Sequence, residues 1–398
     1  MTTLQRIALP TITQAAYASL IKEDPGNPCG EELDAKLSLF DPNGERAMPA
    51  IWYHDPKIYE AERRTVFKDW VAAGRRGDAE GHGSYFTVDI AEEPIVVLQD
   101  KDDLRALRNV CSHRATKLLT KPQGTLSDDV IKCRYHDWRY KFSGAIRSAP
   151  ALGKLEGLSF KDLSLPSFNI ETWGPLVFVQ TKAEKDKGES LQTLLAPLIE
   201  QTAKINLSSW KWAARKEYVV NCNWKVYVDN FLDGGYHVKT IHPGLANALD
   251  LKRYRNEVFD RCSVQKAPVQ DIADDPNAAV RKGSEDAMYW WIFPNTMVNI
   301  YNGAMDTNIV LPLGPDKCKV IFDFYFADGW DKLSIEKYIN GVDGKGGADE
   351  VQLQDSEVCE AVQVGLRSLS YKAGPYAKPE ISKHFHKLVA SELNKINA

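Results

Sequence analysis

Two short loops, each holding one cysteine and one histidine, constrain this chain more than any other feature. The first loop reads Cys111-Ser112-His113 and the second reads Cys133-Arg134-Tyr135-His136, with nineteen residues between them. Zinc sites of the Cys2His2 kind usually take both cysteines from one loop and both histidines from the next. Here each loop supplies one of each, which suits a 2Fe–2S cluster whose two irons carry unlike ligands.

This pattern, followed by the run WRYKFSGAI at 138–146, resembles the ligand loops of Rieske domains. In such a cluster two thiolates hold one iron and two imidazoles hold the other. The resemblance assigns these roles to Cys111, Cys133, His113 and His136. A zinc site is the alternative on spacing alone. Rieske domains commonly have glycine after the last ligand, and Asp137 stands there instead, which removes no ligand.

A second pair of histidines, His237 and His242, lies about 100 residues further along. On an ideal helix five residues correspond to a rotation of about 140°, so the two imidazoles would not share a face. Gly234-Gly235 before the pair and Pro243 after it predict that the helix is distorted or ends between them. Two imidazoles and a distant carboxylate would form the facial triad of non-haem Fe(II), which leaves positions open for O2. The alternative is two ordinary histidines at a helix end.

Composition narrows the class of protein. The 398 residues are 43% hydrophobic and 26% charged with a net charge of −4, which predicts a globular protein of two or three domains and argues against nucleic acid as a partner. Apolar runs stay below the ~18 residues of a membrane span, so we expect no membrane association. Seven scattered cysteines favour a reducing compartment, and we predict a cytoplasmic location. The Thr-rich N-terminus, without an acid before Glu23, is a weak candidate for organelle targeting.

The periodicity predicts an α+β protein in three parts. Residues 1–48 form an N-terminal extension, and residues 49–182 form a domain of short strands around the two loops, with a leading helix that begins at Asp55-Pro56. A charged, glycine-containing linker at 183–189 opens the third part, residues 183–398. We expect antiparallel strands at 262–328 in this part and a long helix from Asp349 onward.

Together these features resemble the large subunit of the Rieske non-haem iron oxygenases, most closely choline monooxygenase and relatives that act on quaternary amines. The similarity runs from about Pro49 to the C-terminus and is carried by NWKVYVDNFLDGGYHV at 223–238, PNTMVNIYNGAMDTNIVLPLGPDKCKVIFDFYF at 294–326, EVCEAVQVGLRSLSYKAGPY at 357–376 and HFHKL at 384–388. The resemblance implies a Rieske β-domain beside a helix-grip (START-like) antiparallel-sheet catalytic domain, arranged as a homotrimer. It implies a monooxygenase that uses O2 to convert a small amine, with choline to betaine aldehyde as the first expectation.

Carried over by position, the iron ligands are His237, His242 and Asp355. Four other acids are near enough in sequence to replace Asp355 after a small shift in alignment, namely Asp349, Glu350, Glu357 and Glu360. Asp233 matches the family's bridging carboxylate, which connects the iron site to a cluster histidine of the neighbouring subunit. In many members that acid precedes the histidine by three residues; here it precedes by four, which keeps it on the same helix face as His237.

Aromatic residues could form a cage for a quaternary ammonium group. The candidates are Tyr289, Trp291, Phe293 and Tyr301, and the alternative is that they are sheet core. Three other functions stay open: an aromatic-ring-hydroxylating oxygenase, an oxygenase or demethylase acting on glycine betaine or carnitine, and an electron carrier without mononuclear iron.

The surroundings of the two loops predict a protein partner. Between Lys101 and Arg147 there are eleven Lys or Arg and five acids, a local charge of +6. The chain has no G-x-G-x-x-G fingerprint after a strand, so electrons must come from another protein. A basic surface near the cluster would attract an acidic ferredoxin or a flavin reductase.

Overall fold

The computed structural model describes residues 30–153, 159–182, 188–270, 286–377 and 379–397. These ranges form two seven-stranded sheets and one three-stranded sheet, with helices packed around them. Most of the predicted linker at 183–189 and most of the N-terminal extension lie outside the described residues. None of the described helices has the length and apolar character needed to cross a bilayer.

The first sheet is antiparallel, with the order β1-β10-β9-β4-β3-β2-β5. Its strands are β1 (Val71–Arg75), β2 (Ser84–Ile90), β3 (Glu93–Asp100), β4 (Asp103–Arg108), β5 (Gln123–Thr125), β9 (Ser167–Trp173) and β10 (Leu176–Gln180). Helix α2 (Gly30–Leu37) and helix α3 (Pro56–Arg64) precede the sheet. Asp55 begins α3 as predicted, because its carboxylate accepts hydrogen bonds from the N–H groups of Lys57 (2.8 Å) and Ile58 (3.3 Å).

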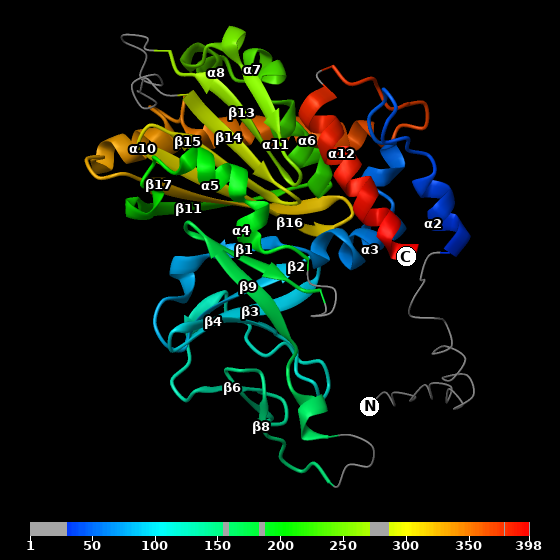
Figure 1. The fold of residues 1–398 in the computed structure, drawn as a ribbon, viewed down its shortest axis with the longest axis vertical. Coiled ribbons are helices and arrows are strands. Elements are labelled where there is room, and N and C mark those ends of the chain that lie inside the picture. The colour runs from blue at the N-terminus through cyan, green and yellow to red at the C-terminus, as the bar shows by residue number, and fades with distance from the viewer. Residues whose placement is uncertain (1–29, 154–158, 183–187, 271–285, 378, 398) are drawn as a thin grey trace, which may run out of the picture.

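A small separate sheet carries the second cysteine–histidine loop. It consists of β6 (Val130–Lys132), β7 (Arg139–Lys141) and β8 (Ile146–Ser148). The buried side chains of this sheet and its loop, among them Ile131, Trp138 and Tyr140, belong to a core cluster distinct from the main core. In Figure 1 this small sheet lies at one end of the molecule, beyond β3 and β4, whereas helices α7 and α8 lie at the other end.

The second sheet is an antiparallel meander in chain order from β12 to β17, and β11 pairs along the free edge of β17. Its strands are β11 (Lys211–Val220), β12 (Arg255–Val258), β13 (Cys262–Pro268), β14 (Asp286–Ile292), β15 (Thr296–Tyr301), β16 (Ala304–Gly314) and β17 (Lys317–Phe326). The helices of this half are α4 (Leu191–Leu194), α5 (Ala196–Thr202), α6 (Trp224–Asp233), α7 (Gly235–Ile241), α8 (Pro243–Ala248), α10 (Lys332–Asn340), α11 (Ala348–Gly365) and α12 (Pro379–Leu393). The predicted α+β architecture is confirmed, including the antiparallel strands at 262–328 and the long helix from 349.

Strands β16 and β17 are buried on both faces because helices cover one face and the first sheet packs on the other. On the side of the first sheet, the Asn295 amide exchanges hydrogen bonds of 3.3 Å with the backbone of Ala72. The Arg215 guanidinium bridges Asp323 of β17 and Asp78, which follows β1, at 2.7 Å each. The two halves of the chain are therefore joined by charged as well as apolar contacts.

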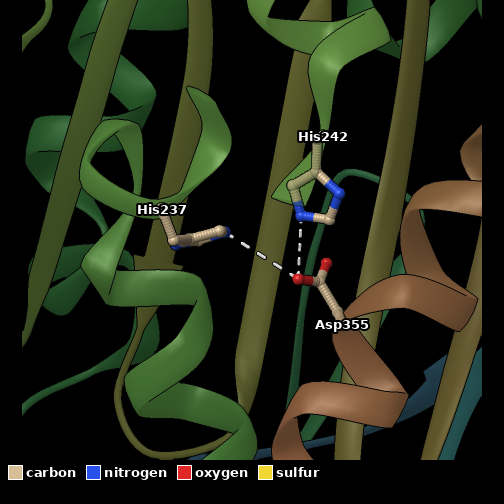
Figure 2. Close-up of side chains that lie close together, drawn as sticks. All are labelled: His237, His242 and Asp355. Atoms are coloured by element: carbon tan, nitrogen blue, oxygen red, sulfur yellow. Dashed lines mark hydrogen bonds and ion pairs between the residues drawn. The ribbon is translucent and has the colours of Figure 1, made fainter. Parts of the chain in front are cut away.

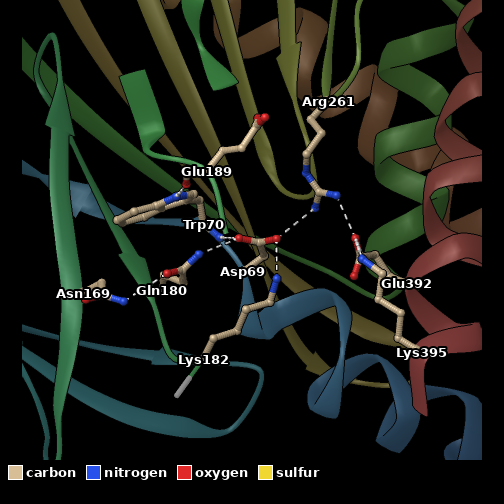
Figure 3. A network of polar contacts seen from close by, with 9 residues as sticks. All are labelled: Asp69, Trp70, Asn169, Gln180, Lys182, Glu189, Arg261, Glu392 and Lys395. Carbon is tan, nitrogen blue, oxygen red and sulfur yellow. Dashed lines mark hydrogen bonds and ion pairs between the residues drawn. The ribbon is translucent and has the colours of Figure 1, made fainter. Parts of the chain in front are cut away.

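Asp69 is the centre of a second polar connection between the two halves (Figure 3). Its carboxylate accepts hydrogen bonds from Gln180 (2.8 Å) and Lys182 (2.7 Å), and Arg261 of the second half lies 3.6 Å away. Arg261 also pairs with Glu392 of α12 at 2.7 Å. Because these groups are largely buried, the network fixes the first sheet against α12 more firmly than exposed ion pairs would.

Candidate active site and cluster site

The short helix α7 carries one of the two central histidines and ends at the other: His237 lies within it, and His242 lies at the break between α7 and α8. Gly234, between α6 and α7, has φ = 48°, and a Cβ there would lie 1.8 Å from the Gln265 side-chain oxygen. Only glycine fits this position. Helix α7 ends at Ile241, and Pro243 begins α8, as the proline predicts. The break turns the two imidazoles toward each other, with ring centroids 5.3 Å apart for His237 and His242.

Asp355 of α11 reaches the space between the two rings (Figure 2). Its Oδ1 lies 2.9 Å from Nε2 of His242 and 3.8 Å from Nε2 of His237. The four other acids near Asp355 in sequence lie elsewhere. Asp349 bonds Tyr218 and Lys216, Glu350 bonds the Gly346 N–H, Glu360 bonds Asn221, and Glu357 is exposed.

Further groups hold the three side chains in place. The amide of Asn230 donates a hydrogen bond of 2.7 Å to Oδ1 of Asp355, and Gln354 Oε1 lies 2.7 Å from Nδ1 of His242. Asp233 lies 3.4 Å from Nδ1 of His237, close enough for an ion pair, although this nitrogen makes no hydrogen bond in the described part of the chain. Metal-binding histidines usually donate their second N–H to such an oxygen, which fixes the tautomer that leaves the other nitrogen free to bind.

The arrangement fits a divalent iron. One donor atom from each of His237, His242 and Asp355 lies within 4.8 Å of the other two. Burial alone would lower the pKa of His242, but the hydrogen bond and charge of Asp355 raise it. The Asp355 carboxylate thus favours a positive charge beside His242. Two imidazoles and one carboxylate on one side form the donor set of non-haem iron, with room for other ligands opposite.

The triad opens onto a cavity between the helices and the second sheet. Its floor is one row of neighbouring side chains across three strands: Tyr289, Asn299 and Asp306, paired in register. Tyr301 and Tyr254 also line it, with Phe231 and Leu245 among the apolar residues. A concave, mostly apolar cavity with a few polar groups is typical of a small-molecule site.

Only two of the four aromatic candidates lie at this cavity. Tyr289 and Tyr301 line it, and their hydroxyl oxygens are 3.2 Å apart. Trp291 instead packs against Phe385 of α12 with ring centroids 5.3 Å apart, and the Arg261 guanidinium lies 4.6 Å above the Phe293 ring. These two side chains are core, the alternative considered above.

The two cysteine–histidine loops come together at the tip of the small sheet. Cys111 and Cys133 are at most 2% exposed, whereas His113 is exposed and His136 is half-buried. The two imidazole rings are 4.6 Å apart, and His113 stacks on Trp138 at 4.7 Å. The thiols therefore lie inward and the imidazoles outward, as a cluster with unlike irons requires.

Local hydrogen bonds fit the thiols to bind metal. Burial alone would raise the pKa of Cys133, but the backbone N–H groups of Tyr135 and His136 lower it and so favour the thiolate. The Tyr140 hydroxyl lies 3.1 Å from Cys111 Sγ. Asp137 has φ = 58°, the left-handed conformation that explains why glycine is common at this position.

Comparison with known families agrees with both sites. Residues 69–169 match the Rieske [2Fe-2S] domain, and residues 207–395 match the ring hydroxylating alpha subunit (catalytic domain). Choline monooxygenase, chloroplastic, of Arabidopsis thaliana is 36% identical over 382 residues, which cover 91% of this chain and 86% of that protein. The chain belongs to the Rieske non-haem iron oxygenases.

Other members of this family are more distant. The carnitine monooxygenase oxygenase subunit of Escherichia coli (strain K12) is 27% identical and covers 88% of this chain and 94% of its own. Among solved structures, the quaternary ammonium Rieske monooxygenase CntA shares the fold with a TM-score of 0.73 at 24% identity, over 90% of this chain and 98% of that one. Naphthalene 1,2-dioxygenase from a Rhodococcus species shares it with a TM-score of 0.70 at 18% identity, over 93% of this chain and 99% of that one.

Membership of the Rieske oxygenases confirms three predictions: the chain is a non-haem iron monooxygenase, its fold is a Rieske β-domain with an antiparallel-sheet catalytic domain, and its cofactors are a Rieske 2Fe–2S cluster and mononuclear iron. The zinc alternative and the electron-carrier alternative are excluded.

Sequence reasoning missed several residues of the oxygenase site. Gln354 and Asn230, which contact the triad, give no pattern of their own because polar residues on a helix are usually solvated. Asp306 did carry a signal. It is an acid near the start of β16, a strand otherwise rich in apolar residues, and an acid that is only 4% exposed needs a local reason.

Proposed function

We propose that this oxygenase hydroxylates a small quaternary ammonium compound, with choline, converted to betaine aldehyde, as the first candidate. Relatives named as choline and carnitine monooxygenases support the substrate class. The observation that carries the proposal is the cavity beside the triad, lined by Tyr254, Tyr289 and Tyr301. Aromatic faces attract a quaternary ammonium group, which cannot donate hydrogen bonds to ordinary polar partners.

In this proposal His237, His242 and Asp355 hold the mononuclear iron. Bound iron supplies the redox chemistry that O2 needs. Overall, one oxygen atom enters a C–H bond of the substrate and the other leaves as water, with two electrons and two protons consumed. Asn230 and Gln354 keep Asp355 and His242 in their binding orientations. The apolar cavity wall excludes bulk water from the reacting substrate.

Electrons would arrive from the cluster held by Cys111, His113, Cys133 and His136. Within one chain the small sheet and helices α7 and α8 lie at opposite ends (Figure 1). We therefore propose that the cluster of one copy serves the iron of the next, in a homotrimer. Asp233, close to His237 and 39% exposed at its side chain, is placed to bridge to a cluster histidine of that next copy.

The cluster would be reduced by a separate protein, either an acidic ferredoxin or a flavin reductase. The basic residues around the cluster loops support such docking. Arg114 and Arg134, next to ligands in sequence, are both exposed. Complementary charge mainly accelerates encounter between such partners.

The proposal is tested with the purified protein carrying both cofactors, supplied with an NAD(P)H-fed reductase and a panel of substrates. The panel contains choline, carnitine, glycine betaine, naphthalene and toluene, and both O2 consumption and product are measured. We expect product from at least one quaternary amine and none from the two hydrocarbons. Product from the hydrocarbons alone would overturn the proposal in favour of an aromatic-ring-hydroxylating oxygenase.

A further inference from the structure

The two imidazoles proposed to hold iron are fixed in different ways. Nδ1 of His242 lies 2.7 Å from Gln354 Oε1, so a side-chain hydrogen bond orients this ring. Nδ1 of His237 is buried and makes no hydrogen bond within the ranges that the structure describes, with Asp233 at ion-pair distance, 3.4 Å away. The direction of the His237 ring therefore depends on the backbone that carries it.

That backbone is the break at Gly234 and Gly235 between α6 and α7, and two side chains fill the space around it. Gln265 of β13 lies against Gly234, where an added Cβ would be 1.8 Å from its Oε1. Tyr254 lies against Gly235, where an added Cβ would meet the tyrosine ring at 2.9 Å. The shape of the break is thus set by close packing against Gln265 and Tyr254.

Hydrogen bonds connect these two side chains to the ends of both helices. Gln265 Nε2 donates a hydrogen bond of 2.9 Å to the carbonyl of Phe231, in the last turn of α6, where carbonyls have no partner within the helix. The Tyr254 hydroxyl donates to Gln265 Oε1 at 3.0 Å. Burial raises the pKa of Tyr254, against a backbone hydrogen bond from Gly235 of α7, so its hydroxyl keeps the proton that it donates. Gln265 is 2% exposed, so little water competes for these bonds.

We propose that Gln265, held by Tyr254, is a positioning residue that ends α6 at the glycine pair and so directs His237 toward the iron shared with His242 and Asp355. This inference rests on the proposed iron ligands and deepens that proposal. Gln265 acts through the backbone of the break and not through contact with the metal. Its loss should therefore loosen one ligand of three and leave the other two in place.

The test is an anaerobic titration of Fe(II) into protein whose cluster is intact and whose mononuclear iron has been removed with a chelator. Gln265→Leu keeps an extended side chain and removes both hydrogen bonds. We expect it to weaken iron binding by about 10–100-fold, the range for a group that supports a ligand. The iron and sulfide of the cluster should be unchanged. With nitric oxide added, the paramagnetic resonance spectrum of the bound Fe(II) should change from one species to several, because His237 is no longer held in one orientation.

A second variant tests whether the two side chains act as one unit. Tyr254→Phe keeps the ring against Gly235 and removes only the hydroxyl, so it should weaken iron binding by about threefold or more, the effect of one neutral hydrogen bond. The double variant should bind iron as Gln265→Leu does, because members of one network are not additive. If Gln265→Leu does not fold, Tyr254→Phe still decides, since wild-type iron affinity in this variant would overturn the inference.

The matched control is Gln201→Leu. Gln201 of α5 is also partly buried and donates a hydrogen bond of 2.8 Å to Glu257, away from the break. Measured below the unfolding temperature of each variant, it should bind iron like the wild type. Equal iron affinity in Gln265→Leu and Gln201→Leu would mean that Gln265 serves only the fold, and would overturn the inference while leaving the proposed function intact, since the titration involves no substrate. Wild-type iron affinity in His237→Ala would instead overturn the ligand set on which the proposed function depends.

Discussion

The two metal-binding regions of this chain are built in opposite ways. The four proposed cluster ligands lie within one stretch of the chain, from Cys111 to His136, and the two imidazoles face outward. The proposed iron ligands come from α7, the end of α7 and α11, and His242 is 2% exposed. The difference follows from the tasks: a cluster must be reached by other proteins, whereas an oxygenation site must exclude water.

Their electrostatic surroundings differ as well. The cluster loops are basic, although the structure pairs several of these residues with acids: Arg105 with Asp100 and Asp103, Lys117 with Asp89, and Lys132 and Arg139 with Asp137. The cavity instead contains the acids Asp306 and Asp355. The basic cluster region is the one to which we propose that an anionic partner protein docks.

The sharpest test of this contrast is to remove one metal site by mutation and ask whether the other is unchanged. Asp355→Ala should lose mononuclear iron and more than about 100-fold of turnover, since even groups that merely support a ligand contribute about 10–100-fold. The protein should stay brown, with the cluster's iron, sulfide and reduced-state spectrum unchanged. Glu357→Ala, an exposed position on the same helix, is the matched control and should behave like the wild type. Normal turnover of the Asp355 variant would remove this residue from the ligand set.

A second test concerns the connection between the regions. Asp233→Asn should keep both metals but slow electron delivery by about 10–100-fold, because a neutral amide holds the facing histidines less firmly. The measurement is the rate of cluster oxidation when the reduced protein is mixed with O2 and choline. Unchanged rates would show that Asp233 is not the bridge.

A third test changes the basic surface alone. Arg114→Glu with Arg134→Glu should slow reduction by a protein donor by about 10-fold or more at low salt, and the effect should shrink as salt rises. Reduction by dithionite should be unaffected. Lys211→Glu makes the same charge reversal on β11, away from the cluster, and should leave donor kinetics unchanged. If the double variant matches this control, the donor docks elsewhere.

The smallest effect on activity is expected from a change at Asp69, which connects the two halves of the chain. Asp69→Asn should lower the free energy of unfolding by about 1–3 kcal/mol at pH 7, since it weakens hydrogen bonds to charged groups (Figure 3). Turnover at 25 °C should be retained. Burial alone would raise the pKa of Asp69, but Lys182, Gln180 and Arg261 lower it.

A carboxylate whose pKa is lowered in the folded state stabilises the protein at every pH above its unfolded pKa of about 3.9. This stabilisation is lost as the pH falls through the pKa of the folded state. The difference between wild type and Asp69→Asn in urea unfolding should therefore disappear in acid. A difference that persists at low pH would mean that the network acts through packing rather than charge.

The contrast between the regions also explains what the sequence could reveal. The meeting of the two cysteine–histidine loops was predictable because their spacing is local, and the strands around them because of their alternation. The helix break was predictable from Gly234 and Pro243. Asp355 could be located only through family resemblance, since no local pattern connects it to His237, 118 residues away.

The side chains that line the cavity on the sheet were the least predictable part of the site. Tyr289 and Trp291 share one face of β14, and alternation cannot tell which end of that face is open. The structure shows that α12 covers Trp291 through Phe385, whereas Tyr289 faces the cavity. Asp306 carries a signal as an acid within an apolar strand, but its neighbours from β15 and α10 are distant in sequence and could not be predicted.

The most direct test of the account is a single-turnover reaction without any partner protein. The fully reduced holoenzyme is mixed with O2 and either choline or 3,3-dimethylbutan-1-ol, and cluster oxidation and product are followed together. We predict that with choline the cluster is oxidised as betaine aldehyde forms, and that with the uncharged isostere it stays reduced. Cluster oxidation at the same rate with both, or oxidation with choline but no product, would contradict the proposal that this oxygenase hydroxylates a quaternary ammonium compound.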